Sequence, residues 1–395
     1  MESDGNVEAS APPELGQILR RLRKEEFPWT AETTYLNNAS IGPLPERTRR
    51  VLDAFTARRA APHLLSHQEL GAVTSEARAA AARLINADAE EIALATNTSF
   101  GLNAAAGALP IEPGETVLVS DKEFPANVYP WLLLRERGVD VELAPVSSEG
   151  WPSEGYLLER LKDPRVRVLA ISFVQFSNGY RADLDLLGAA CRENGTYLVV
   201  DAIQGLGQLP LDVKRTPVDM LAAGGQKWLL SPWGSGILYV RRELVQELRP
   251  ALAGWLSYEG VDDFSHLTDY DTTLCKDARR FELSTPPFQE MAAMTESINL
   301  LMELGVDRIA NYLIHVRRPL LEAAERGEFE IVSPIGCGHD SSIVCVRTEH
   351  VAESYHALKQ AGVVGALREG SIRLSPHCYN TVEEMERVVD ILRGG

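Results

Sequence analysis

The chain has 395 residues, of which 45% are hydrophobic and 24% charged, which is the composition of an ordinary globular protein. This length is too great for one simple core, so we expect one large and one smaller domain. The formal net charge of −17 argues against nucleic acid and anionic membrane surfaces as partners, because both would repel the chain.

The N-terminal part of the chain predicts a tail, a helix and a loop. Residues 1–12 are polar and acidic and lack the basic and apolar regions of a signal peptide, whereas residues 14–27 carry leucines at helical spacing. A turn-rich loop at 33–45 contains two prolines that introduce a helix over 46–60. We therefore assign 1–32 to an N-terminal tail and helix.

In the middle of the chain, short apolar runs alternate with longer helical stretches. The runs are rich in β-branched residues and mostly lack polar alternation, as in strands that are covered on both faces. The predicted strands are 116–121, 139–146, 167–176, 196–202 and 236–242, with helices at 101–110, 127–138 and 183–195. This alternation predicts an α/β fold with a mainly parallel sheet flanked by helices, which we place in a large domain over 33–285.

The C-terminal part has a different pattern. Two long helical stretches, 288–304 and 306–326, precede three short apolar runs, and the chain ends on a further helix. Thr381 and Glu384 form a capping-box signature at the start of that last helix. We assign 286–395 to a smaller α+β domain.

The cysteine and histidine pattern gives no sign of a metal site or of a disulfide framework. None of the five cysteines belongs to a CxxC pair, and neither HExxH nor a His/Cys cluster with zinc spacing occurs. We therefore expect a reduced, cytoplasmic protein without a tightly bound metal. No apolar run approaches the length of a membrane span, so we expect no membrane partner.

Polar residues at the ends of the apolar runs are the first candidates for a site, because open parallel sheets bind ligands at the carboxyl ends of their strands. Asp201 ends the run TYLVVD and is either a helix cap or a carboxylate that meets a cationic or protonatable group. Asn97, Thr98 and Ser99 open an alanine-rich helix, where they are either plain caps or part of an anion site.

Lys227 stands in an unusual place for a charged side chain. It follows an apolar run and two glycines and precedes WLLSPW, so we expect a desolvated amine with a lowered pKa that can form a Schiff base. The alternative is a lysine whose stem packs on the tryptophans. A phosphate site at a helix start, a strand-end aspartate and a desolvated lysine together match the requirements of pyridoxal 5′-phosphate (PLP).

Four stretches carry a family resemblance. They are VVDAIQGLGQLPLDV, GGQKWLLSPWGSGILYVRREL, RRFELSTPPF and REGSIRLSPHCYNTVEEMERVVDIL. In this order they resemble the class V aminotransferase family of fold-type I PLP enzymes, which includes cysteine desulfurases, kynureninases and isopenicillin N epimerase-like enzymes. The likeness runs over roughly residues 33 to 394. It implies a large domain with a mainly parallel, seven-stranded type of sheet, a smaller C-terminal domain, and a homodimer with shared active sites.

The resemblance also implies roles for individual residues around the cofactor. Lys227 would hold PLP as an internal aldimine, and Asp201 would pair with the pyridinium nitrogen. Phe124 and Gln226 stand where desulfurases have histidines. The remaining implied cofactor contacts are Gln204 at the ring hydroxyl, Thr98, Ser99 and Gln226 at the phosphate, Phe124 on the ring, Asn178 beside the cofactor, and Thr285 reaching the phosphate of the neighbouring subunit.

The resemblance places the substrate near Arg373, which would pair with the α-carboxylate of a small-molecule amino acid. Arginine suits this role because it stays charged and binds a carboxylate through two parallel hydrogen bonds. Asn37, Asn38 and Ser40 lie in the family's early loop near the substrate.

The expected reaction proceeds through an external aldimine and an α-carbanion and ends in transamination. Racemisation or epimerisation and C–S lysis remain open, as does a binding module of the same fold without catalysis. Desulfurases carry a nucleophilic cysteine just before the carboxylate-binding arginine, but residues 362–373 contain none and Cys378 lies beyond it. A persulfide step is therefore not expected.

Overall fold

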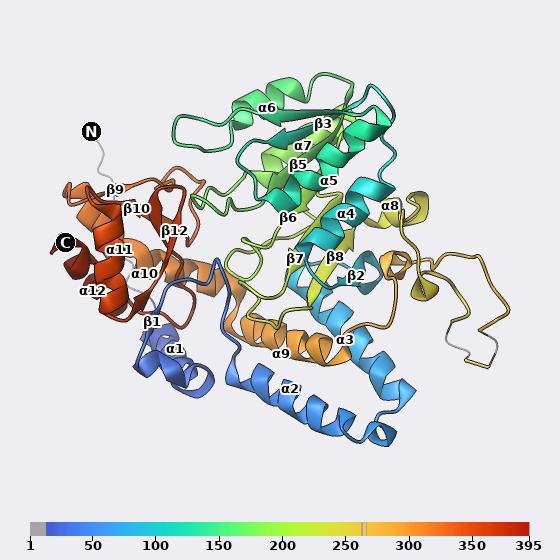
Figure 1. Cartoon of the computed structure of the whole chain (residues 1–395), viewed down its shortest axis with the longest axis horizontal. Helices are drawn as coiled ribbons and strands as arrows, with labels where there is room; N and C mark the ends of the chain where they lie inside the picture. Colours follow the sequence, from blue (N-terminus) through green and yellow to red (C-terminus); the bar gives the residue numbers. More distant parts are fainter. Residues whose placement is uncertain (1–12, 262–263, 266, 395) are drawn as a thin grey trace.

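A seven-stranded sheet forms the centre of the larger part of the molecule (Figure 1). The computed structural model describes residues 13–261, 264–265 and 267–394. The strand order is β2-β8-β7-β6-β5-β3-β4, and β8 alone runs antiparallel to its neighbours. The strands are β2 (Ile92–Ala95), β3 (Thr116–Ser120), β4 (Asp140–Ala144), β5 (Val166–Ser172), β6 (Tyr197–Asp201), β7 (Met220–Gly224) and β8 (Gly236–Val240). The α/β fold class with a mainly parallel sheet is confirmed.

Both faces of this sheet are buried, which explains why its strands lack polar alternation. Successive side chains of a strand point to opposite faces. Along β7, Met220 and Ala222 pack in one hydrophobic cluster with α4 (Thr98–Ala108), whereas Leu221 and Ala223 belong to a second cluster with α7 (Leu184–Asn194). The large sheet is therefore a middle layer between two helical layers.

The remaining helices cover the sheet or build the smaller part of the molecule. α2, α3 and α9 pack side by side below the sheet in Figure 1. The helices are α1 (Pro13–Glu26), α2 (Glu46–Arg59), α3 (His67–Ile85), α5 (Tyr129–Leu133), α6 (Glu154–Arg160), α8 (Arg242–Glu247), α9 (Phe288–Leu304), α10 (Val306–Glu325), α11 (Val351–Gln360) and α12 (Val382–Arg393). Short 3-10 helices lie at Pro28–Ala31, Pro62–Leu64, Ala89–Glu91, Pro125–Asn127, Leu134–Arg137, Trp255–Ser257 and Ala278–Phe281. No helix in the described residues is both long and apolar enough to cross a membrane.

The smaller part contains a four-stranded antiparallel sheet with the order β12-β13-β10-β9. The predicted capping box is confirmed at the start of α12, where the Thr381 side chain accepts from the Glu384 backbone N–H. The remaining strands of the chain are β1 (Thr34–Tyr35), β9 (Glu330–Ile331), β10 (Val344–Arg347), β11 (Val363–Val364), β12 (Ala366–Arg368) and β13 (Ser371–Leu374).

Three sets of contacts cross the domain boundaries expected from the sequence. β1 pairs in parallel with β11, and Arg23 of α1 forms an ion pair with Glu384 of α12 at 2.6 Å. α9 packs against α2 and α3 of the larger part. The division into 1–32, 33–285 and 286–395 therefore stays a prediction.

Candidate active site

The carboxyl ends of the parallel strands bring the expected site residues together. Asp201 is the last residue of β6, and Lys227 follows β7 by three residues. Phe124 follows β3, and β2 leads through Asn97 into α4. Because these strands run in the same direction, their ends meet at one edge of the sheet.

A cavity of about 200 Å³ lies at this edge. Its walls come from the early loop, the large sheet and the β12–β13 hairpin. The lining residues are Ala39, Ser40, Phe124, Phe176, Gln204, Lys227, Arg368 and Arg373. Five of them, namely Ser40, Phe124, Gln204, Lys227 and Arg373, were expected from the sequence. The lining contains three cationic side chains and no carboxylate.

Lys227 is the amine of this cavity. Its Nζ lies 5.5 Å from the centroid of the Phe124 ring. Burial lowers the pKa of Lys227 to about 8, although the nearby Asp201 carboxylate acts in the opposite direction. Arg373 and Arg368 lower it further by charge repulsion. A substantial fraction of this amine is therefore neutral and nucleophilic close to neutral pH.

Asp201 is a buried carboxyl group that lacks an arginine or lysine ion-pair partner within the described chain. It is 2% exposed, and its Oδ1 accepts a hydrogen bond of 3.0 Å from the Ile203 N–H. Burial raises the pKa of Asp201 to about 6. A carboxyl group in this environment is suited to hold a proton jointly with a ligand nitrogen.

The N-terminus of α4 offers free hydrogen-bond donors. Asn97 is the helix cap, since its Oδ1 accepts from the Phe100 N–H at 2.8 Å, and the Thr98 hydroxyl accepts from the Gly224 N–H at 2.8 Å. The backbone N–H groups of Thr98 and Ser99 have no acceptor among the described residues. This end of an eleven-residue helix therefore combines plain capping with an available anion site.

The two glycines before Lys227 allow close packing at the same place. A Cβ on Gly224 would lie 2.4 Å from Oε1 of Gln226, and one on Gly225 would lie 2.4 Å from Oγ of Ser235. Gln226 is therefore held against the end of β7, near Thr98. Its side chain forms no hydrogen bond within the described residues, so its amide is available to a ligand.

A series of hydrogen bonds, closed through the backbone of residues 375–377, includes two residues of the cavity lining, and we call it the site ring. Nε1 of Trp228 donates to Oε1 of Gln204 at 2.8 Å, and Nε2 of Gln204 donates to the Ala39 carbonyl at 3.0 Å. The Ala39 N–H donates to Oγ of Ser375 at 3.0 Å, and the nearby His377 ring contacts the Trp228 carbonyl at 3.1 Å. The site ring joins the loop after β7, which carries Lys227 and Trp228, to the early loop and to the end of β13.

The tautomer of His377 follows from its two contacts. Its Nδ1 accepts from the Cys378 N–H at 2.7 Å, so Nε2 carries the proton and donates to the Trp228 carbonyl. Burial lowers the pKa of His377 to about 4, which keeps the ring neutral.

Arg373 is buried and forms no ion pair with a described residue. It is 2% exposed, and it donates at 2.7 Å to the Phe176 carbonyl and to the Ser40 hydroxyl. Its Nε has no acceptor, and burial lowers the pKa of Arg373 to about 10. Nearby, Nδ2 of Asn38 and Oδ1 of Asn37 are also buried without a partner. Of these groups, Nε of Arg373 belongs to a residue that lines the cavity and is available to a polar ligand.

Seven of the expected residues do not line the cavity of this chain, namely Asp201, Thr98, Ser99, Gln226, Asn38, Asn178 and Thr285. Asn178 uses both ends of its amide on the protein, donating to the Gly150 carbonyl at 2.9 Å and accepting from the Tyr180 N–H at 3.0 Å. Thr285 is exposed and does not line the cavity.

Sequence reasoning missed several residues of the site. Glu123 is buried next to Phe124; its carboxylate accepts from the Ser172 N–H at 2.8 Å, from Nε2 of Gln175 at 2.5 Å and from the Ser172 hydroxyl. Burial raises the pKa of Glu123 to about 7, and the Asp201 charge adds to this. A buried glutamate carries no local sequence signal, whereas Arg368 could have been found from its place five residues before Arg373.

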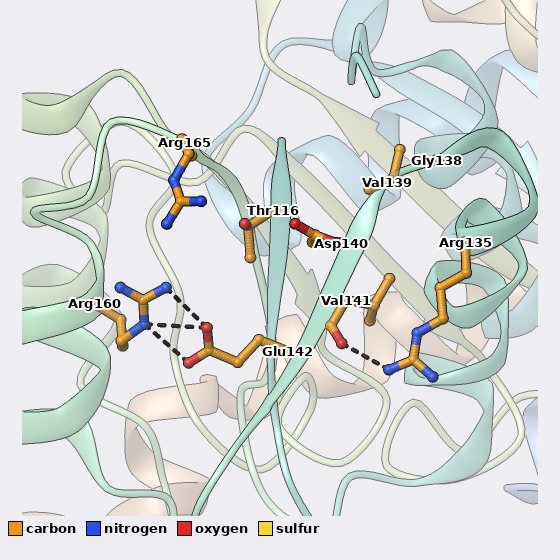
Figure 2. A pocket seen from close by; sticks show the side chains of 9 residues that line it. All are labelled: Thr116, Arg135, Gly138, Val139, Asp140, Val141, Glu142, Arg160 and Arg165. Carbon is orange, nitrogen blue, oxygen red and sulfur yellow. Dashed lines mark hydrogen bonds and ion pairs between the residues drawn. The ribbon is translucent and has the colours of Figure 1, made fainter. Parts of the chain in front are cut away.

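A wider hollow of about 480 Å³ lies at the opposite, amino ends of β3 and β4 (Figure 2). Its arginines are already held by the protein. Arg160 pairs with Glu142 at 2.9 Å, and Arg135 donates to the Val141 carbonyl at 2.7 Å, as the dashed lines in Figure 2 mark. Arg165 pairs with Asp163 at 2.8 Å. The 200 Å³ cavity, with its unpaired cations, is therefore the better candidate.

Comparison with known proteins shows the family to which the chain belongs. The family model "Aminotransferase class-V" matches residues 34–388. The chain is 33% identical over 318 residues to an uncharacterized aminotransferase, YcbU, of Bacillus subtilis, which covers 80% of this chain and 82% of that protein. It is 28% identical to a probable cysteine desulfurase of Pyrococcus abyssi, covering 93% and 96%. An apo cysteine desulfurase structure from Thermococcus onnurineus shares the fold, with a TM-score of 0.84, 24% identity and 98% coverage of both chains.

Proposed function

The chain belongs to the class V aminotransferase family and is a PLP-dependent enzyme, and from this premise we propose that it catalyses transamination of a small amino acid. One observation carries the proposal. The cavity places the desolvated amine of Lys227 beside the unpaired guanidinium of Arg373. An amine that is partly neutral and a fixed cation are the two groups needed to bind an amino acid and remove its α-proton.

The residues present fit PLP. The free N–H groups of Thr98 and Ser99 and the amide of Gln226 would hold the phosphate, and Asp201 would face the ring nitrogen. Lys227 would provide the amine. When bound, PLP supplies an aldehyde that reacts with amines and a ring that withdraws electrons from the substrate's α-carbon.

The chain's own side chains then have distinct tasks. Arg373 binds the α-carboxylate with its unused Nε and its Nη atoms. The neutral Nζ of Lys227 would take the proton from the substrate's α-carbon, and transamination requires that it deliver this proton to a carbon of the cofactor instead of returning it to the α-carbon. Asp201 holds a proton at the ring nitrogen, for which its raised pKa is suited. Phe124 and Phe176, whose ring centroids are 5.3 Å apart, form an apolar wall of the cavity.

Transamination is preferred because of what the cavity lining contains. Lys227 is the only lining side chain that titrates near neutral pH, whereas epimerisation through two bases needs a second acid–base group. A persulfide step needs an accessible, activated thiol. Burial raises the pKa of Cys378 to about 12, and the thiol of Cys345 donates to the Ser177 carbonyl at 3.1 Å. C–S lysis without a persulfide cysteine is the second candidate, supported by the relatives named cysteine desulfurase.

The test is a panel of amino acids offered to the purified, PLP-loaded protein. Keto-acid formation that depends on an added keto-acid acceptor supports transamination. Acceptor-independent sulfide release from cysteine would instead establish C–S lysis, and α-deuterium exchange without product would establish epimerisation. K227A should abolish turnover and the borohydride-stable PLP adduct, whereas K214A, which changes an exposed lysine, should keep both. A protein that neither binds PLP nor turns over any amino acid contradicts the proposal and favours a binding module.

We also propose a homodimer in which each chain completes the other's site. Thr285 is exposed and does not line the cavity of its own chain. The chain also exposes large apolar side chains, with Trp233 70%, Leu252 66% and Tyr270 84% exposed. Sedimentation or light scattering should give twice the mass of one chain, and a monomer with full activity would contradict this arrangement.

A further inference from the structure

We propose that Arg368 binds a second anionic group of the substrate, so that the preferred amino acids carry an acidic side chain. This inference rests on the proposed function, since it concerns the substrate of the same cavity. In this proposal Arg373 binds the α-carboxylate that all amino acids share, and Arg368 binds the acidic side chain and so determines which amino acids are preferred.

The charge of the cavity is the first argument. Arg368, Arg373 and Lys227 line one hollow of about 200 Å³ that no acidic residue lines. Arg368 forms no ion pair with any residue that the structure describes, in a chain with 56 acidic and only 39 basic residues. Arg368 also lowers the pKa of both Arg373 and Lys227, which means that the three cations repel one another. One carboxylate at Arg373 leaves this excess positive charge only partly balanced.

The geometry is the second argument. Both guanidinium groups approach the hydroxyl of Ser40, with Nη2 of Arg373 at 2.7 Å and Nη2 of Arg368 at 3.5 Å. Among the described residues, the only other acceptor for a donor of Arg368 is the Leu367 carbonyl, which Nη1 contacts at 2.7 Å. Of the five N–H donors of an arginine, most are therefore free on Arg368. Two guanidinium groups converge on one place and keep unused donors there.

Burial separates the tasks of the two arginines. Arg373 on β13 is buried, whereas Arg368 at the end of β12 is exposed, although the hairpin register keeps them on adjacent strands. The group that every amino acid shares therefore fits the buried arginine. The group that differs between amino acids fits the arginine at the mouth. A side-chain carboxylate, or a similar acidic group, has the charge and the paired acceptor oxygens that a guanidinium binds.

The test measures binding without turnover. Calorimetry on the PLP-loaded protein compares glutarate with its monoamide, and succinate with its monoamide, since each pair differs only in one charge. The wild type should bind each dicarboxylate about tenfold tighter than the monoamide, a typical effect of one charge-assisted hydrogen bond near a surface. R368Q should lose this preference. R347Q, which removes an exposed cation of the same small sheet, should keep it.

Each outcome decides the proposal. If the wild type binds both members of a pair equally, the second anion site does not exist. If R368Q weakens diacid and monoamide by the same factor, both arginines bind one carboxylate and the proposal is wrong. R368K guards against a folding defect, because it keeps the charge and should retain part of the preference. The outcome for the proposed function can be distinguished from this one. If the protein prefers the dicarboxylates but forms no keto acid from glutamate or aspartate, transamination is wrong and the second anion site stands.

Discussion

Replacing Glu123 by glutamine should stabilise the cofactor-free protein at alkaline pH and remove part of its pH dependence. The amide can keep every contact of the buried carboxyl group. Its oxygen can accept from the Ser172 N–H and from Gln175, and its nitrogen can donate to the Ser172 hydroxyl, which in the wild type contacts the carboxylate. The substitution therefore changes the charge of this side chain and leaves its shape nearly unchanged.

The size of the effect follows from the pKa of Glu123, which burial raises from its ordinary 4.5 to about 7. A raised pKa in the folded protein gives stability that is fully present below about pH 4.5 and is lost as the pH rises through 7. At about 1.4 kcal/mol per unit, the shift corresponds to roughly 3 kcal/mol of unfolding free energy. Glutamine does not titrate and so does not lose this contribution.

The assay is urea unfolding of the cofactor-free wild type and E123Q at pH 5, 6.5 and 8. The difference between the two proteins should grow with pH in favour of E123Q. Asp201, whose pKa burial raises to about 6, gives both proteins a slope of the same sign, so the difference reports the charge of Glu123 together with its repulsion of Asp201. E353Q, the same change on the exposed face of α11, should follow the wild type at every pH. An E123Q deficit that is equal at all three values would refute the reasoning, because contact geometry rather than charge would then control stability.

Three further predictions concern the same fold. H377N can keep an acceptor for the Cys378 N–H but loses the donor to the Trp228 carbonyl, whereas the longer side chain of H377Q can keep that donor. We therefore expect PLP to dissociate faster from H377N than from H377Q, as measured by absorbance during dialysis. Acylation of Lys227 in cofactor-free protein, followed by peptide mass spectrometry, should reach half its maximal rate near pH 8 rather than near the ordinary 10.5. R78M leaves the buried Glu282 carboxylate without the Arg78 guanidinium, which lies 2.7 Å away in the wild type, and should lower the unfolding free energy by about 3–5 kcal/mol. The double variant R78M/E282Q should recover most of this lost stability, as measured by urea titration.

Much of the fold could be predicted because strands that are buried on both faces are apolar at successive positions, and this pattern is visible in the sequence. The five predicted strands are rich in β-branched residues and lie within one residue of β3, β4, β5, β6 and β8 at their starts. β2 and β7 were missed. Their sequences, IALA and MLAAG, are rich in alanine and glycine, which have low strand propensity, and their pairing with β8 stabilises them.

The predicted helix over 127–138 was wrong in its length. The chain there forms the short helix α5 and a 3-10 helix, Leu134–Arg137. Similarly, the apolar run 167–176 stops being a strand at Ser172, and its last residues form the loop that brings Phe176 into the cavity. Apolar periodicity alone does not show where tertiary contacts end an element.

Only those site residues could be predicted that lie at the end of an apolar run or within a motif of the family. Asp201 and Lys227 were found because each stands at a place where an apolar run stops. Glu123 and His377 depend instead on partners far away in the sequence. Glu123 is held by a residue 49 positions later, and His377 contacts a carbonyl 149 positions earlier. No local pattern encodes such pairs.

The unpaired polar groups of the molecule give an independent argument for the location of the ligand. Buried polar atoms in native proteins nearly always have hydrogen-bond partners, so each exception needs an explanation. Six buried side-chain atoms lack one among the described residues, and three of them belong to Asn37, Asn38 and Arg373. The site ring beside them has its contacts made. The fold therefore leaves an unused donor, Nε of Arg373, on a residue that lines the cavity, where the carboxylate of an amino acid would supply the missing partner.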